Sequence, residues 1–208
     1  MERWFADTCA EGFEPRMGIV LAHGAGSDAN SALLRAVSRE LAGAGILVLR
    51  MNLAFRLARA GPPRPAESPR DRDSLREAMA ELRRLAGASI PLLLGGHSYG
   101  GRQASMLAAE EPDVAAALVL LSYPLHPPDK PAQLRTAHFP QLRTPALFIH
   151  GDRDPFGTID ELAAAIAAIP ARTQLVVAAK KGHDLGGAKP PAIAAHIADA
   201  GFLQAADR

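Results

Sequence analysis

The 208-residue chain has little cysteine, little net charge and no long apolar run. Its only cysteine is Cys9, which excludes an intramolecular disulfide and suits a reducing compartment. Lysine and arginine number 23 against 22 acidic residues, and a net charge of +1 provides no field that attracts nucleic acid or an anionic membrane. No apolar stretch reaches the roughly 18–20 residues of a membrane span, and residues 1–7 lack the apolar core of a signal peptide. We therefore expect a cytoplasmic protein without nucleic-acid or membrane partners.

The hydropathy pattern predicts one α/β domain over residues 1–208. Short apolar runs alternate with helical patterns, which is typical of a mostly parallel sheet covered by helices on both faces. The runs lie at 18–22, 46–49, 90–94, 114–121, 145–149 and 174–177. One or two edge strands before Arg16 bring the expected sheet to about six to eight strands.

Two segments between these runs are rich in proline. The segment 56–72 also carries five arginines, and we expect a solvated, mobile loop, with a basic docking patch as the alternative. A helix is expected to follow it at 73–85, and the last helix to open at Pro190 and to end at Gly201. The prolines of 122–145 exclude a large helical lid. The site is therefore expected to be open.

The stretch Gly96-x-Ser98-x-Gly100 lies between the apolar run 90–94 and a helical segment at 102–109. This spacing is the nucleophile-elbow pattern, in which a sharp turn raises a serine hydroxyl above a sheet. The glycines let strand and helix approach closely, and the helix N-terminus directs N–H groups at developing negative charge. The alternative is a serine that only caps a helix. The strand before it and the helix after it favour the catalytic interpretation.

Two candidate acids, Asp152 and Asp154, follow the fifth apolar run, and His183 follows the sixth. Asp152 lies directly beyond the strand, where the pleat constrains its side chain. Asp154 lies in the turn before Pro155, which favours extended backbone and lets the carboxylate point across to the neighbouring strand. Because the carboxyl ends of parallel strands share one edge of a sheet, we expect Asp154 and His183 to lie near Ser98.

These motifs resemble the α/β-hydrolase family over nearly the whole chain. In that family the triad follows the chain order serine, acid, histidine. The resemblance places Ser98 at the nucleophile, Asp154 at the acid position of an HGxxDxx motif, and His183 at the base. It also implies an oxyanion hole formed by the backbone N–H groups of Tyr99 and of Ala25, which lies in a loop of small residues.

Two segments narrow the resemblance. Residues 95–102 and 122–128 are similar to the small, lidless, dienelactone-hydrolase-like branch of the family. That branch includes uncharacterised bacterial hydrolases and the hydrolase-like domain of a histone-acetyltransferase complex subunit. Dienelactone hydrolases carry a cysteine nucleophile where this chain has Ser98. This departure argues against a dienelactone substrate.

Three further residues are candidates for substrate contact. His126 lies near the expected mouth of the site, and Phe156 ends the acid motif. Arg102, in the first turn of the elbow helix, can bind a substrate carboxylate or form a structural ion pair. His97 is expected to pack and to form hydrogen bonds, because its side chain should point away from that of Ser98. Surface roles are expected for His138 and His196.

The sequence therefore predicts a serine esterase that cleaves carboxylic esters or thioesters of small molecules. Ser98 attacks the carbonyl carbon, His183 transfers the proton, and Asp154 orients the histidine. We expect no cofactor, and the histidine or cysteine pairs typical of zinc sites are missing from the sequence. The alternative is a non-catalytic binding or scaffold protein, because a fold alone does not fix a function.

Overall fold

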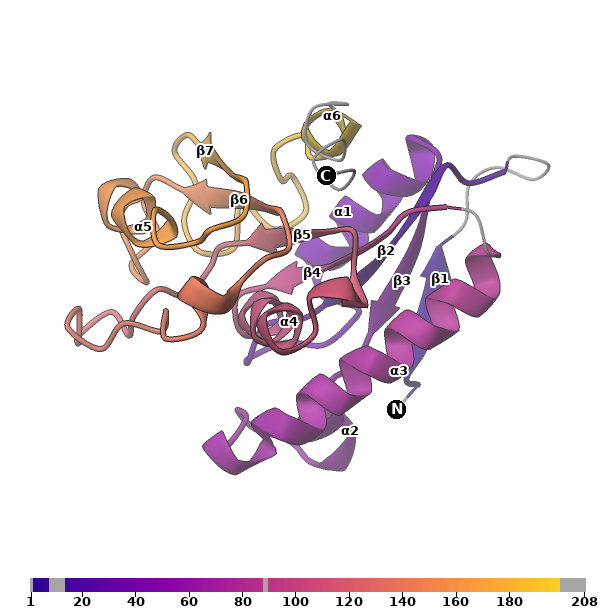
Figure 1. Ribbon diagram of the computed structural model, residues 1–208, viewed down its shortest axis with the longest axis horizontal. Coiled ribbons are helices and arrows are strands. Elements are labelled where there is room, and N and C mark those ends of the chain that lie inside the picture. Colours follow the sequence, from indigo (N-terminus) through magenta and orange to yellow (C-terminus); the bar gives the residue numbers. More distant parts are fainter. Residues whose placement is uncertain (1, 8–13, 88–89, 199–208) are drawn as a thin grey trace.

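A seven-stranded sheet, with only its first strand antiparallel, positions the rest of the described chain (Figure 1). The computed structural model describes residues 2–7, 14–87 and 90–198, so Cys9 lies outside the described residues. The strand order is β1-β3-β2-β4-β5-β6-β7. The strands are β1 (Trp4–Asp7), β2 (Met17–Ala22), β3 (Ile46–Met51), β4 (Leu92–His97), β5 (Ala117–Leu121), β6 (Ala146–Gly151) and β7 (Thr173–Ala178). The predicted α/β class and strand number are confirmed.

Helices cover both faces of this sheet (Figure 1). They are α1 (Ala32–Gly43), α2 (Ala54–Ala58), α3 (Ser68–Ala86), α4 (Tyr99–Glu110), α5 (Ile159–Ile166) and α6 (Ala194–Ala198). Successive strand residues point to opposite faces. In β2, Val20 packs in the layer formed with α3 and α4, whereas Ile19 and Leu21 pack in the layer formed with α1 and α6. This double burial explains why the central strands read as continuous apolar runs.

The prediction of a loop over 56–72 is wrong at both ends. Helix α2 covers its start, and α3 begins at Ser68, five residues earlier than expected. A 3-10 turn, Pro65–Glu67, leads into α3, and Pro69 fits the first helical turn because that turn needs no donor from its backbone nitrogen. Glu67 also pairs with Arg59 at 2.8 Å. Local acids and prolines therefore fold this segment onto the protein.

Smaller differences concern element ends. β5 begins at Ala117 because Pro112–Val114 forms a 3-10 turn, and α6 begins at Ala194, beyond Pro190. The helix end expected at Gly201 lies outside the described residues. Segment 122–145 is fully described and contains one 3-10 turn, Phe139–Gln141, and no α-helix. In the described parts of the chain, no helix is long and apolar enough to cross a membrane.

Candidate active site

Ser98 occupies the turn between β4 and α4 in a backbone conformation that few residues with a Cβ atom adopt. Its φ is 51° and its ψ is −116°, and its N–H donates to the carbonyl of Leu121 at 2.8 Å. Such a conformation costs about 1–3 kcal/mol and is concentrated at functional sites. The Ser98 side chain makes no capping hydrogen bond to α4. The hydroxyl is therefore available to another partner.

The glycines on either side of Ser98 are required by close backbone contacts. A Cβ atom on Gly96 would lie 2.4 Å from the carbonyl oxygen of Ala22. One on Gly100 would lie 2.6 Å from the carbonyl oxygen of His23. Both neighbours are backbone atoms and cannot move aside as a flexible side chain would. The GxSxG spacing thus reflects the packing of the turn against the end of β2.

A continuous hydrogen-bonded chain joins Ser98, His183 and Asp154. Nε2 of His183 lies 2.8 Å from Oγ of Ser98, and Nδ1 lies 2.8 Å from Oδ2 and 3.0 Å from Oδ1 of Asp154. Since a carboxylate only accepts, Nδ1 carries the proton of the neutral ring and Nε2 is left to accept from the serine hydroxyl. The structure brings together the three residues that the sequence placed at the ends of β4, β6 and β7.

The carboxylate of Asp154 is held ionised in a buried position. Its side chain is fully buried, and the N–H of Phe156 donates to Oδ1 at 2.9 Å. Burial alone would raise the pKa of Asp154, but the hydrogen bond and charge of His183 and the Phe156 N–H together lower that pKa below its usual value. Asp152 is exposed, and among the described residues its side chain has no hydrogen-bond partner. Of the two candidate acids, Asp154 alone contacts His183.

The loop His23–Ser27 lies beside Ser98 and carries one of the two N–H groups predicted for an oxyanion hole, so it is called the oxyanion loop here. Ala25 in this loop and Tyr99 at the start of α4 both line the cavity that contains Ser98. Within the described residues neither backbone N–H has an acceptor. A Cβ atom on Gly24 would lie 2.9 Å from Nδ1 of His97. Glycine at this position therefore lets the loop pack closely against the His97 ring. Two free N–H groups are thus placed near the hydroxyl.

Arg56 fastens the oxyanion loop, and sequence reasoning missed it. Its guanidinium donates to the carbonyl of Ser27 and to that of Ala25, each at 2.9 Å. These contacts orient the peptide groups on either side of the small residues. No sequence signal near Arg56 indicates them, because the partners lie about 30 residues away and meet only after folding.

Two buried neutral histidines support the same loops. His23 accepts from the N–H of Leu53 at Nε2 and donates from Nδ1 to the carbonyl of Gly24. Nε2 of His97 lies 2.8 Å from the backbone carbonyl of His183, and this contact holds the loop that carries His183. Burial lowers the pKa of His23 to about 4 and that of His97 to about 4. The predicted packing and hydrogen-bonding place of His97 matches this contact.

The cavity next to Ser98 has a volume of about 510 Å³. Phe156 and Arg102 line it, as proposed for substrate contact, and the Phe156 ring lies 4.2 Å from the His183 ring between centroids. His126 does not line it. Another cavity, of about 540 Å³, lies at the amino ends of β4 and β5, on the far side from Ser98. Because Ser98 lines the first cavity, that cavity is the candidate site.

Two histidine predictions need correction. His126 is buried, only 5% exposed, with Nδ1 at 2.8 Å from the carbonyl of Pro127 and Nε2 facing Glu161, and it does not line the cavity at Ser98. His138 is not a free surface residue, because Nε2 lies 2.8 Å from Oγ of Ser105 and burial lowers its pKa to about 4. His196 lies half-buried on α6.

Fold and site together define an α/β hydrolase. Residues 15–196 match the model of the family described as an alpha/beta hydrolase domain, and the chain belongs to that family. No group of three or more histidine, cysteine or acidic residues in the described chain is placed to hold a metal ion.

Solved structures from three organisms are similar to this chain. An alpha-beta serine hydrolase homologue from Coxiella burnetii is 17% identical, with 88% of this chain and 83% of that chain covered and a TM-score of 0.69. A dienelactone hydrolase from Anabaena variabilis is 22% identical, with 97% of this chain and 85% of that chain covered and a TM-score of 0.68. An a/b serine hydrolase without a lid from Xanthomonas campestris is 20% identical, with 86% of this chain and 79% of that chain covered and a TM-score of 0.66. These likenesses are of fold, and they agree with the predicted α/β-hydrolase fold. The narrower dienelactone-hydrolase-like branch stays a prediction. The similarity to a histone-acetyltransferase subunit stays a prediction.

Proposed function

We propose that this protein is a serine hydrolase that cleaves carboxylic esters or thioesters of small molecules through an acyl-enzyme intermediate. The observation that carries the proposal is the hydrogen-bonded chain from Ser98 through His183 to the buried Asp154. A serine hydroxyl is a weak nucleophile unless a base takes its proton, and a base works best when a third group fixes its tautomer. Membership of the hydrolase family supports the same assignment.

The first half of the reaction forms the acyl-enzyme. Oγ of Ser98 bonds to the substrate carbonyl carbon while its proton passes to Nε2 of His183, and the carbonyl oxygen becomes an oxyanion. The N–H groups of Ala25 and Tyr99 stabilise this oxyanion, and such donors are worth about 2.7–4 kcal/mol each. The bond to the leaving alcohol or thiol then breaks, and His183 returns the proton to the leaving group.

The second half releases the acid. Water loses a proton to Nε2 of His183 and attacks the acyl carbon. The new oxyanion collapses, the bond to Ser98 breaks, and the proton on His183 returns to Oγ. Asp154 stays ionised throughout and stabilises the imidazolium that forms in both halves.

A fluorophosphonate probe tests the role of Ser98. We expect the probe to label the wild-type protein, and Ser98→Ala to abolish the labelling together with ester hydrolysis. Ser31→Ala is the matched control, because Ser31 caps α1 in the other layer of the fold. Equal labelling of Ser98→Ala would contradict the assignment. If the folded wild type neither reacts with the probe nor cleaves esters or thioesters, the chain is a binding or scaffold protein.

A further inference from the structure

The wall of the cavity at Ser98 carries several arginines and no acidic residue among the described residues. The arginines are Arg64, Arg102 and Arg135. They come from three separate parts of the chain. An exposed arginine alone means little, but three converging on one cavity beside the nucleophile give that cavity a positive potential.

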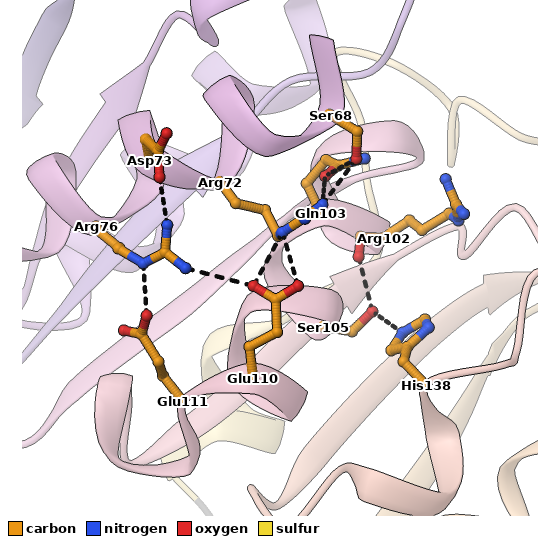
Figure 2. A network of polar contacts seen from close by, with 10 residues as sticks. All are labelled: Ser68, Arg72, Asp73, Arg76, Arg102, Gln103, Ser105, Glu110, Glu111 and His138. Atoms are coloured by element: carbon orange, nitrogen blue, oxygen red, sulfur yellow. Dashed lines mark hydrogen bonds and ion pairs between the residues drawn. The ribbon is translucent and has the colours of Figure 1, made fainter. Parts of the chain in front are cut away.

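Arg102 lies one helical turn after Ser98 on α4, and its N–H donates to the Ser98 carbonyl at 2.9 Å. Figure 2 shows its guanidinium without a partner among the residues drawn, and the contact drawn to Arg102 ends on its backbone carbonyl, which accepts from the Ser105 hydroxyl. Its Nε is buried, and no hydrogen-bond partner for it exists in the described chain. The structural ion pair that the sequence left open for Arg102 is therefore not formed in the described chain.

The neighbouring arginines on α3 show the contrast. In Figure 2, Arg72 pairs with Glu110 at 3.1 Å, and Arg76 pairs with Glu111 at 2.6 Å. These pairs join α3 to the far end of α4. Arg72 and Arg76, which lie between the two helices, each pair with a carboxylate of the other helix or its end. The side chain of Arg102 points away from these pairs (Figure 2).

Arg135 is held at the same cavity from the other side. Its Nη1 donates to the carbonyl of Pro124 at 3.3 Å, and its own carbonyl accepts from the Tyr123 hydroxyl at 2.6 Å. Burial first, and then the charge of Arg102, lower the pKa of Arg135. Arg102 and Arg135 place two positive charges at one cavity. Their repulsion costs free energy unless an anion lies between or beside them.

The carboxylates behind the cavity wall are committed elsewhere. Glu67 pairs with Arg59 at 2.8 Å, and Asp71 accepts from the Tyr99 hydroxyl at 2.7 Å and from a backbone N–H. Asp154 is bonded to His183. The anion that would balance Arg102 and Arg135 therefore has to come from outside the described protein.

We propose that the ester cleaved at Ser98 carries an anionic group, a carboxylate, which Arg102 and Arg135 bind. This inference rests on the proposed function and names its substrate class. A planar guanidinium matches a carboxylate with two parallel hydrogen bonds, so it fixes orientation as well as charge. Four residues of helix rise about 6 Å, so a chain of several carbons joins the reacting carbonyl at Ser98 to the charged end at Arg102.

Matched esters provide the test. Monoethyl adipate and ethyl hexanoate differ by a carboxylate in place of a methyl group and share the ester that reacts. We expect the wild type to favour monoethyl adipate at least about tenfold in kcat/KM at low salt. Arg102→Gln and Arg135→Gln should each lower this ratio about tenfold or more, and Arg102→Lys should lower it less. Arg39→Gln, which removes one positive charge from the exposed face of α1, should leave the ratio unchanged.

Binding of adipate itself separates this inference from the proposed function. We expect Ser98→Ala to bind adipate by calorimetry, more weakly as salt increases, and the double variant with Arg102→Gln to lose about tenfold or more in affinity. If Ser98→Ala binds inorganic phosphate more tightly than adipate, and the double variant loses that binding, the substrate is still anionic but its charged group is a phosphate. If ethyl hexanoate is hydrolysed as well as monoethyl adipate and the arginine variants leave the ratio unchanged, the inference fails while the proposed function stands. If no ester is cleaved and the probe does not label Ser98, the proposed function fails. Adipate binding then still decides whether the cavity is an anion site, and its absence overturns that as well.

Discussion

Replacing Asp154 with asparagine tests the buried carboxylate at its own position. The N–H of Phe156 donates to Oδ1 at 2.9 Å, while Oδ2 lies 2.8 Å from Nδ1 of His183. In Asp154→Asn the amide oxygen takes the place of Oδ1, because the Phe156 N–H would otherwise lose its acceptor. The amide NH₂ then faces His183. A donor there makes Nδ1 the acceptor, so the ring proton moves to Nε2, which can no longer accept the proton of Ser98.

The expected loss follows from this tautomer change. In the serine-protease precedent the same substitution leaves the geometry intact and lowers kcat about 10⁴-fold, or roughly 5.4 kcal/mol at 1.36 kcal/mol per tenfold. The Asp154 side chain is fully buried, so solvent does not screen its effect on the imidazolium. We expect kcat to fall about 10³–10⁴-fold. Asparagine has nearly the shape of aspartate, and the protein should stay folded.

The assay compares kcat for 4-nitrophenyl acetate in three proteins: the wild type, Asp154→Asn and Asp152→Asn. Asp152 is the matched control because it is exposed two residues away, and we expect less than about a threefold change there. Thermal melts must first show that both variants are folded. The reasoning is refuted if folded Asp154→Asn keeps more than about a tenth of wild-type kcat, or if Asp152→Asn is the more damaging change.

Gly100→Ala should destabilise the protein by about 1–3 kcal/mol, because its Cβ would lie 2.6 Å from the His23 carbonyl oxygen. Gly43→Ala, which meets no atom within 4 Å at the end of α1, should stabilise by up to about 1 kcal/mol; thermal melts showing equal shifts would contradict this. Arg56→Leu releases the oxyanion loop and should lower kcat about tenfold with a smaller change in KM, and an unchanged kcat would exclude the positioning role. Between pH 6.5 and 4 the unfolded chain binds more protons than the folded one at His23, His97 and His138, whose pKa values are about 4 when folded. The free energy of unfolding should therefore decrease as the pH is lowered from 6.5 to 4, by up to about 1.4 kcal/mol per pH unit for each histidine, and His138→Gln should reduce this slope when it is measured by urea unfolding.

The local sequence determined the elements and the ends of the strands that carry chemistry. Apolar runs between helical patterns predict a parallel sheet, because strands buried on both faces have no polar side to alternate with. The motif around Ser98 predicts the elbow, because glycines at 96 and 100 are the residues that such a turn tolerates. Parallel strands then bring Asp154 and His183 to the same edge as Ser98. These inferences need only short stretches of chain and one rule of topology.

What the tertiary structure decided are contacts between segments far apart in the chain. Arg56 reaches the oxyanion loop about 30 residues away, and Pro62–Pro65 and Ser68, which lie between the end of α2 and the first turn of α3, form one wall of the cavity. His126 faces Glu161 and does not line the cavity at Ser98. Whether Arg102 has a carboxylate partner depends on which nearby acidic side chains already bond to other groups. Only the folded chain shows that Glu67 bonds to Arg59 and Asp71 to Tyr99. The type of a residue sets which donor and acceptor atoms it offers. Which partners those atoms meet is decided by the packing of elements that lie far apart in the sequence.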